Sequence, residues 1–164
     1  MEVAPEITQR AAVPYAGISQ WVTMSAVGSV ADRIPEIFGW LGAHGITPAG
    51  PPFFRYHVVD MERQLLVEAG IPVTSAIDDD GDIRGGTLPA GRFAVMTHTG
   101  APETLAAATS ALLGWAQERG LAWDVSQTDA GEKWACRIES YLTNPAEQPD
   151  TSKWQTELAF RLAD

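Results

Sequence analysis

The chain of 164 residues has a single cysteine and no long apolar run. One cysteine, Cys136, excludes a disulfide within the chain and is typical of a reducing compartment. No segment approaches the ~18 consecutive apolar residues that a membrane-spanning helix needs, and the first residues lack the basic start and apolar run of a signal peptide. We therefore expect a cytoplasmic protein that makes no contact with a membrane.

Basic residues are also scarce, since 11 lysines and arginines stand against 21 aspartates and glutamates, for a net charge of −10. They are scattered along the chain, whereas a protein that binds a nucleic-acid duplex needs a basic patch. Nucleic acid is therefore not an expected partner. The acidic surface favours solubility and attraction for cationic ligands.

The common signatures of catalysis and of metal binding are missing too. There is no glycine-rich phosphate loop and no Gly-x-Ser-x-Gly turn. The three histidines, His44, His57 and His98, lack metal-ligand spacing. The acidic run 78–82 resembles the start of a calcium loop but lacks the later ligands and the distal glutamate, so we interpret it as a solvated loop. We expect no metal and no cofactor.

What the chain does contain is a repeated segment. Phe38-Gly39-Trp40, followed four residues later by Gly45-Ile46, recurs as Leu113-Gly114-Trp115 followed by Gly120-Leu121. The offset is close to half of the chain, which predicts a single domain, 1–164, with an internal repeat at about 3–75 and 90–162. A seam between two similar halves is a common place for a small molecule to bind. Six tryptophans exceed what a core this small needs and favour an aromatic-lined pocket.

Each half is expected to form a strand, a helix and two further strands. Ser29 or Asp32 offers the N-terminal cap of the first helix, and Gly45 would end it near His44. The expected strands of the first half are one or two within 7–24, interrupted at Pro14, then 53–59 and 65–73, before a polar connector at 78–86. The second half is expected to have strands at 93–99, 134–142 and 154–162 and a helix at 102–118. The fold class is therefore α+β, an antiparallel sheet with both main helices on one face.

The segment 133–142 alternates strictly between two sets of side chains. We expect Trp134, Cys136, Ile138 and Leu142 to face the helices, and Arg137, Glu139 and Tyr141 to lie on the opposite face. If that face is open to water, this is an ordinary solvated strand. If the other half covers it, Glu139 is a partly buried carboxylate that needs a partner, and a cationic or hydrogen-bonding ligand would supply one.

Two further glutamates lie on polar sides of expected strands. Glu157 belongs to the last strand, and Glu68 ends the corresponding strand of the first half. Both would flank the seam if the halves face one another. The alternative is that both are exposed charges at a sheet edge.

Several segments, in this order, resemble one known family. They are Gly91–Gly100, the helix end Gly114–Gly120, Ile138–Tyr141 with Asn144-Pro145, Thr156–Leu158, and in the first half Pro48–Pro52 and Glu68–Val73. Together they resemble the GyrI-like small-molecule-binding domain, the effector-binding domain of MerR- and AraC-type drug-responsive regulators. Because no DNA-binding segment precedes the domain, the chain is similar to the stand-alone form. The resemblance implies two pseudo-symmetric strand-helix-strand-strand modules, an aromatic cleft between them and a central acidic residue, which maps onto Glu139.

Three functions follow as hypotheses. The first is stand-alone binding of bulky, planar aromatic or cationic molecules, as in drug or toxin sensing or sequestration, with Glu139 meeting the ligand's charge. The walls would come from Trp21, Phe53, Tyr56, Trp134, Tyr141 and Trp154, with Glu68 and Glu157 nearby, although Phe53 and Tyr56 cannot both face one side of a regular strand. The second, which the resemblance implies, is hydrolysis of cyclopropanoid toxins with Glu139 as general base. The third is a decoy for a basic protein. The oligomeric state stays open.

Overall fold

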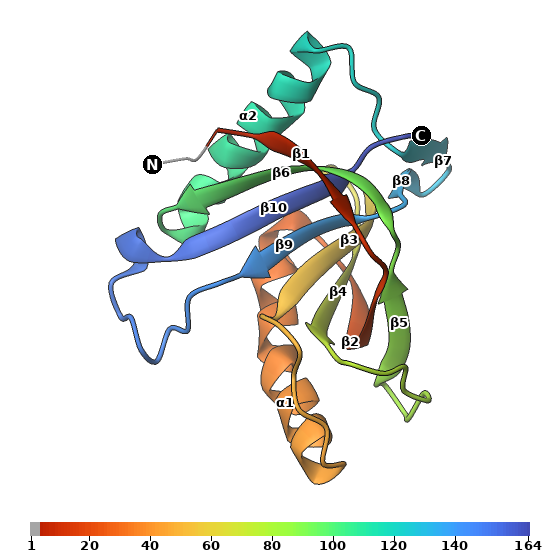
Figure 1. Ribbon diagram of the computed structural model, residues 1–164, viewed down its shortest axis with the longest axis vertical. Helices are drawn as coiled ribbons and strands as arrows, with labels where there is room; N and C mark the ends of the chain where they lie inside the picture. The colour runs from red at the N-terminus through yellow and green to blue at the C-terminus, as the bar shows by residue number, and fades with distance from the viewer. Residues whose placement is uncertain (1–3) are drawn as a thin grey trace.

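The computed structural model describes residues 4–164, so residue 3, the first of the expected repeat, lies outside the described part. Within residues 4–164, ten strands form one curled antiparallel sheet, in which eight strands run in the order β1-β6-β10-β9-β3-β4-β2-β5 (Figure 1). The short β7 pairs with β8, and β8 also pairs with β3. The strands are β1 Glu6–Arg10, β2 Val13–Val22, β3 Phe53–Val59, β4 Leu65–Pro72, β5 Arg84–Leu88, β6 Gly91–Thr99, β7 Val125–Thr128, β8 Gly131–Trp134, β9 Arg137–Tyr141 and β10 Gln155–Arg161.

The order of the strands is symmetric about the β3–β9 pair. On one side lie β4, β2 and β5, and on the other lie β10, β6 and β1. The first strand of each half crosses to the other half, because β1 pairs with β6 and β5 pairs with β2. This is the order expected for two pseudo-symmetric modules; a common origin by duplication stays a prediction.

Both main helices, α1 Ile34–Ala43 and α2 Leu105–Glu118, pack on one face of the sheet. Figure 1 shows them far apart along it, α2 in the upper part of the view and α1 in the lower. We call the apolar layer beneath them the helix-side core. It includes Ile37 and Leu41 of α1, Ala108 and Leu112 of α2, and from the sheet Ile18, Phe54, Val67, Met96, Leu158 and Phe160. The expected α+β fold with both helices on one face is confirmed.

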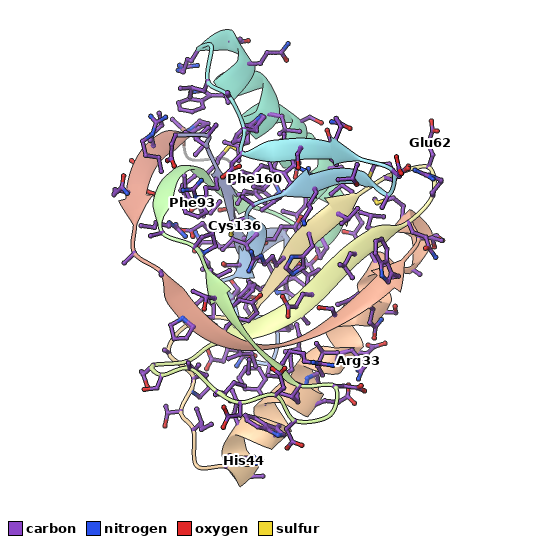
Figure 2. The ribbon with its side chains drawn as sticks, turned by 90° about the vertical axis from the view of Figure 1, so that its right-hand side faces the viewer. Arg33, His44, Glu62, Phe93, Cys136 and Phe160 are labelled. Carbon is purple, nitrogen blue, oxygen red and sulfur yellow. The ribbon has the colours of Figure 1, made fainter. Side chains whose placement is uncertain are left out.

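The opposite face of the curled sheet carries a second apolar cluster, which we call the far-side core. It consists of Tyr15, Phe53, Leu88, Phe93, Val95, Cys136, Ile138 and Ala159. Figure 2 labels Phe93 and Cys136 of this cluster and Phe160 of the helix-side core. The sheet is thus buried on both of its faces over much of its area.

Four features differ from the sequence prediction. The first helix begins at Ile34 and not at a Ser29 or Asp32 cap, because both residues lie in a preceding 3₁₀ helix, Met24–Arg33. Pro35 occupies the first helical turn, and Gly45 has the expected positive φ of 66°. The break between the first two strands falls at 11–12 and not at Pro14, which lies in β2 opposite Thr87. Proline is tolerated in a strand at positions where the ladder does not require the N–H donor that proline lacks.

The other two differences concern the connector and the second half. The connector predicted at 78–86 contains the edge strand β5, in which Gly86 packs against Tyr15; a Cβ at this position would lie 2.4 Å from the Tyr15 ring. The strand predicted at 134–142 is broken at 135–136 into β8 and β9, and β8 turns away to pair with β7. Two short 3₁₀ helices, Pro102–Thr104 and Thr151–Lys153, precede α2 and β10. Between residues 4 and 164, no helix is long and apolar enough to cross a membrane.

Candidate functional site

The central strand β9 turns the face opposite to the predicted one toward the helices. Glu139 lies opposite Phe54 in the β3–β9 register, and Phe54 belongs to the helix-side core. Cys136 and Ile138 instead belong to the far-side core. Within β9 the two sets are separated as predicted, but their assignment to faces was wrong. Trp134, which was predicted to share a face with Cys136, lies in the helix-side core because the strand breaks at 135–136. An apolar set does not have to face the helices when both faces of a sheet are buried.

Glu139 is the partly exposed centre of this face. The Tyr141 hydroxyl donates a hydrogen bond to its Oε2 atom at 2.9 Å, and the Tyr56 hydroxyl also hydrogen-bonds to the carboxylate. Burial raises the pKa of Glu139 above its ordinary value, and the two hydrogen bonds and the charge of Arg137 offset only part of that rise. Within residues 4–164, no cation forms an ion pair with this carboxylate.

Aromatic rings surround the carboxylate. Tyr141 packs edge-to-face on Phe54 with ring centres 5.3 Å apart, and Tyr56 does the same at 6.5 Å. Burial, followed by the charge of Glu139, raises the pKa of both tyrosines well above the ordinary value. Both hydroxyls therefore stay protonated at neutral pH and remain donors toward the carboxylate.

Arg137 lies on the same side of β9, two residues before Glu139, and is 7% exposed. Its guanidinium carbon is 4.7 Å from the ring centre of Phe160, 5.0 Å from that of Trp134 and 5.7 Å from that of Tyr56. Burial lowers the pKa of Arg137. In the described part of the chain, no hydrogen bond or ion pair holds this guanidinium.

The other two predicted glutamates lie on the far side of the sheet and not beside Glu139. Glu68 is buried and accepts hydrogen bonds from the Tyr15 hydroxyl and from His57 Nε2, the latter at 2.8 Å. Glu157 forms an ion pair with Arg10 at 2.7 Å. Both carboxylates thus already have partners, and they cannot contact a ligand together with Glu139.

Only some of the aromatic residues that were predicted to line the site lie near Glu139. Tyr56 and Tyr141 contact Glu139, and Trp134 adjoins it through Arg137. Phe53 is buried in the far-side core against Tyr15, with ring centres 5.0 Å apart. Trp21 is 50% exposed near the end of β2, opposite Leu66 of β4. Trp154 precedes β10, and its indole N–H donates to the Gln148 carbonyl at 2.7 Å.

Two surface hollows of about 420 Å³ each lie away from Glu139. Met96, Ser110, Trp115 and Glu118 line one of them, beside α2, and the other lies at Trp21, Arg63 and Gln64. Among residues 4–164, no group of three or more histidine, cysteine or acidic side chains is placed to hold a metal ion.

The sequence matches the GyrI-like small molecule binding domain over residues 4–163, almost its whole length. The chain belongs to this family. The resemblance noted from the sequence is thereby confirmed. No curated protein sequence matches the chain.

Several solved structures have the same fold as this GyrI-like domain. The crystal structure of the EcmrR C-terminal domain has a TM-score of 0.78 at 20% identity, and the alignment covers 98% of each chain. In a cryo-EM structure of an EcmrR–DNA complex, the alignment covers 57% of the longer EcmrR chain. The chain thus spans little more than half the length of that protein.

Two more distant neighbours have the same fold. SAV2435 bound to tetraphenylphosphonium has a TM-score of 0.64 at 12% identity, with 98% of this chain and 94% of that chain covered. A hydrolase from Listeria innocua has a TM-score of 0.61 at 12% identity, with 97% and 91% covered.

Sequence reasoning missed two features of the GyrI-like domain, one in the central strand β9 and one in the neighbouring β3. Arg137 was noted only as a neighbour of Glu139, and Phe54 was not considered. The alternation of 133–142 already placed Arg137 and Glu139 on one face. What it could not show was that aromatic rings from β3, β8 and β10 would enclose the guanidinium.

Proposed function

We propose that this GyrI-like domain binds bulky, planar aromatic or cationic small molecules on its helix-side face, centred on Glu139. The observation that carries the proposal is a half-buried glutamate whose carboxylate is held by two tyrosine hydroxyls and has no cationic partner among residues 4–164. Such a carboxylate gains most from a ligand that brings a positive charge or a hydrogen-bond donor. A role in sensing or in sequestration would follow from such binding.

The aromatic surroundings support the same class of ligand. Tyr56 and Tyr141 are both partly exposed and present rings beside the carboxylate. Each aromatic contact with a ligand contributes about 0.5–1.5 kcal/mol beyond burial, and cation–π attraction adds ~0.5–2 kcal/mol. Several such contacts give micromolar affinity without close shape matching. The neighbour SAV2435, whose structure holds tetraphenylphosphonium, supports the choice of a first probe.

The test is a titration of the protein with tetraphenylphosphonium, followed by isothermal calorimetry and by tryptophan fluorescence. We expect saturable binding that Glu139→Gln weakens by about ten- to a hundredfold, the range for loss of a hydrogen bond or contact to a charged group. Gln is nearly isosteric and removes only the charge.

Glu157→Gln is the matched control. It removes a carboxylate of the same kind from the opposite face of the sheet, where Glu157 pairs with Arg10. We expect this variant to bind the probe as the wild type does. An equal loss in both variants, or no saturable binding by a varied panel of planar and cationic compounds, would contradict the proposal.

A second candidate function, hydrolysis of a strained electrophilic ring such as a cyclopropanoid toxin, uses the same residue as general base. The specific observation in its favour is the raised pKa of Glu139, since a base that works near neutral pH needs a pKa above that of an ordinary glutamate. A hydrolase is among the structural neighbours. In this case Glu139→Gln would still bind the substrate but lose ~10²–10⁴-fold in turnover.

A further inference from the structure

Two buried N–H donors without acceptors belong to neighbouring side chains on the helix side of the sheet. Arg137 Nε and Trp134 Nε1 are both buried, and neither has a hydrogen-bond partner among residues 4–164. The guanidinium carbon of Arg137 is 5.0 Å from the Trp134 ring centre, so the two side chains are in contact. Buried donors in folded proteins are nearly always paired, so an unpaired neighbouring pair points to an acceptor from outside the chain.

The aromatic rings around Arg137 stabilise its charge but do not replace that acceptor. Phe160, Trp134 and Tyr56 lie 4.7, 5.0 and 5.7 Å from the guanidinium carbon and offer π faces. A guanidinium has five N–H donors in its plane, and their preferred partners are carboxylate or phosphate oxygens. These three contacts therefore leave Arg137 Nε without an oxygen partner among residues 4–164.

Glu139 does not supply that oxygen, although it is the nearest acid on the strand. Its carboxylate accepts hydrogen bonds from Tyr141 and Tyr56, and it forms no ion pair with Arg137 within the described chain. The two residues are two positions apart, ~7 Å along the strand. Tyr56 contacts both, since its hydroxyl bonds Glu139 and its ring faces the Arg137 guanidinium. A negative and a positive group are thus held apart on one face.

We propose that the ligand of this site carries, besides its cationic or donor group, a carboxylate or comparable oxygen anion that binds to Arg137. The ligand class is then a planar aromatic zwitterion, with its cation at Glu139 and its anion at Arg137. This inference rests on the proposed function, because it assumes that Glu139 binds the cationic or donor group of a ligand. Arg137 acts here as a specificity-determining residue.

The test uses one rhodamine in two forms that share the same xanthylium cation. The ethyl ester is a plain cation, and the free acid is a zwitterion at pH 7. Dissociation constants are measured by fluorescence anisotropy for the wild type, Arg137→Met and Glu139→Gln. We expect the wild type to bind the free acid about tenfold more tightly than the ester, as a hydrogen-bonded charge pair would allow. Arg137→Met should abolish this preference, so that its dissociation constants for the acid and for the ester agree within about threefold.

The outcomes separate the inference from the proposed function. Tighter binding of the ester than of the acid by the wild type would overturn the inference and leave the proposed function standing. Equal losses for both dyes in Arg137→Met would show that Arg137 only supports the fold, and would overturn the inference as well. Binding of neither dye nor tetraphenylphosphonium would contradict the proposed function itself. If Arg137→Met does not fold, the wild-type comparison of the two dyes still decides the question.

Discussion

At Glu139, burial and hydrogen bonding act on the carboxyl group in opposite directions. Burial raises its pKa, and the hydrogen bonds from Tyr141 and Tyr56 lower it by less. The ionised form is therefore less favourable in the folded protein than in the unfolded chain. An ionised carboxylate that is buried in this way therefore destabilises the folded protein.

Replacing Glu139 by Gln should consequently stabilise the free protein at alkaline pH. The unfolded carboxyl loses its proton near its ordinary pKa of 4.5 and the folded one at a higher pH. Between these two pKa values the folded state holds more protons, so wild-type stability falls as pH rises through this window and stays low above it. The variant does not titrate. We expect its Tm at pH 8 to exceed that of the wild type by about 2–4 °C, the shift that ~1 kcal/mol gives a chain of this size.

This prediction is checked by thermal unfolding of both proteins from pH 4 to pH 8, with circular dichroism as the readout. The difference in Tm should shrink as the pH falls below the window, where both forms are neutral at this position. A variant that is less stable than the wild type at pH 8 would show that the tyrosine hydrogen bonds outweigh the burial of the charge.

The sequence was more informative about Glu139 than about Arg137. For Glu139, alternation and the family resemblance were sufficient to select it. Its contact with Tyr56 was not predictable, because that contact depends on which strand of the other half lies next to β9. For Arg137, the ring contacts come from β3, β8 and β10, which are distant in sequence.

At the scale of elements, periodicity predicted each strand's two faces well but not which face meets the helices. The β9 assignment failed because Cys136 and Ile138 are apolar and nevertheless belong to the far-side core. The edge strand β5 was taken for a loop since Gly85 and Gly86 are typical of turns. The structure uses these glycines for close approach, as Gly86 lies against the Tyr15 ring.

The close packing of β4 on β3 gives a prediction with an internal control. A Cβ at Gly70 would lie 2.5 Å from the Phe53 ring, and that ring is fixed in the far-side core. Gly70→Ala should therefore cost about 1–3 kcal/mol of unfolding free energy through overpacking. Gly114→Ala is the same chemical change in α2, where nothing lies within 4 Å of the new Cβ. It should stabilise by about 0.5–1 kcal/mol, because alanine is the better helix former.

Urea unfolding of both variants measures these differences. Equal stability of Gly70→Ala and the wild type would show that the Phe53 ring can move aside, and that the far-side core is more loosely packed than its burial indicates.

At the scale of the whole molecule, the two halves are joined by more than the β3–β9 pair. Each half sends its first strand to the other, with β1 on β6 and β5 on β2. The helix-side core likewise combines Leu41 of α1 with Leu112 of α2. The repeat of Gly-Trp segments indicated two halves, and Trp40 and Trp115 do lie in α1 and α2. It could not indicate the strand exchange, because neither edge strand has an apolar pattern of its own.

This interlocking predicts that neither half folds by itself. The segment 74–76 is exposed and lies outside the helices and strands, so the chain can be divided there into fragments 1–75 and 76–164. The first fragment would lose β5 from β2 and β9 from β3, and would expose its part of both cores to water. We expect each fragment alone to show no cooperative unfolding, and an equimolar mixture to refold with a cooperative transition and with the probe binding of the intact chain. Circular dichroism melts and a tetraphenylphosphonium titration measure both properties. A cooperative transition in either fragment alone would show that one half is an autonomous unit, and that the exchanged strands are accessory to the fold.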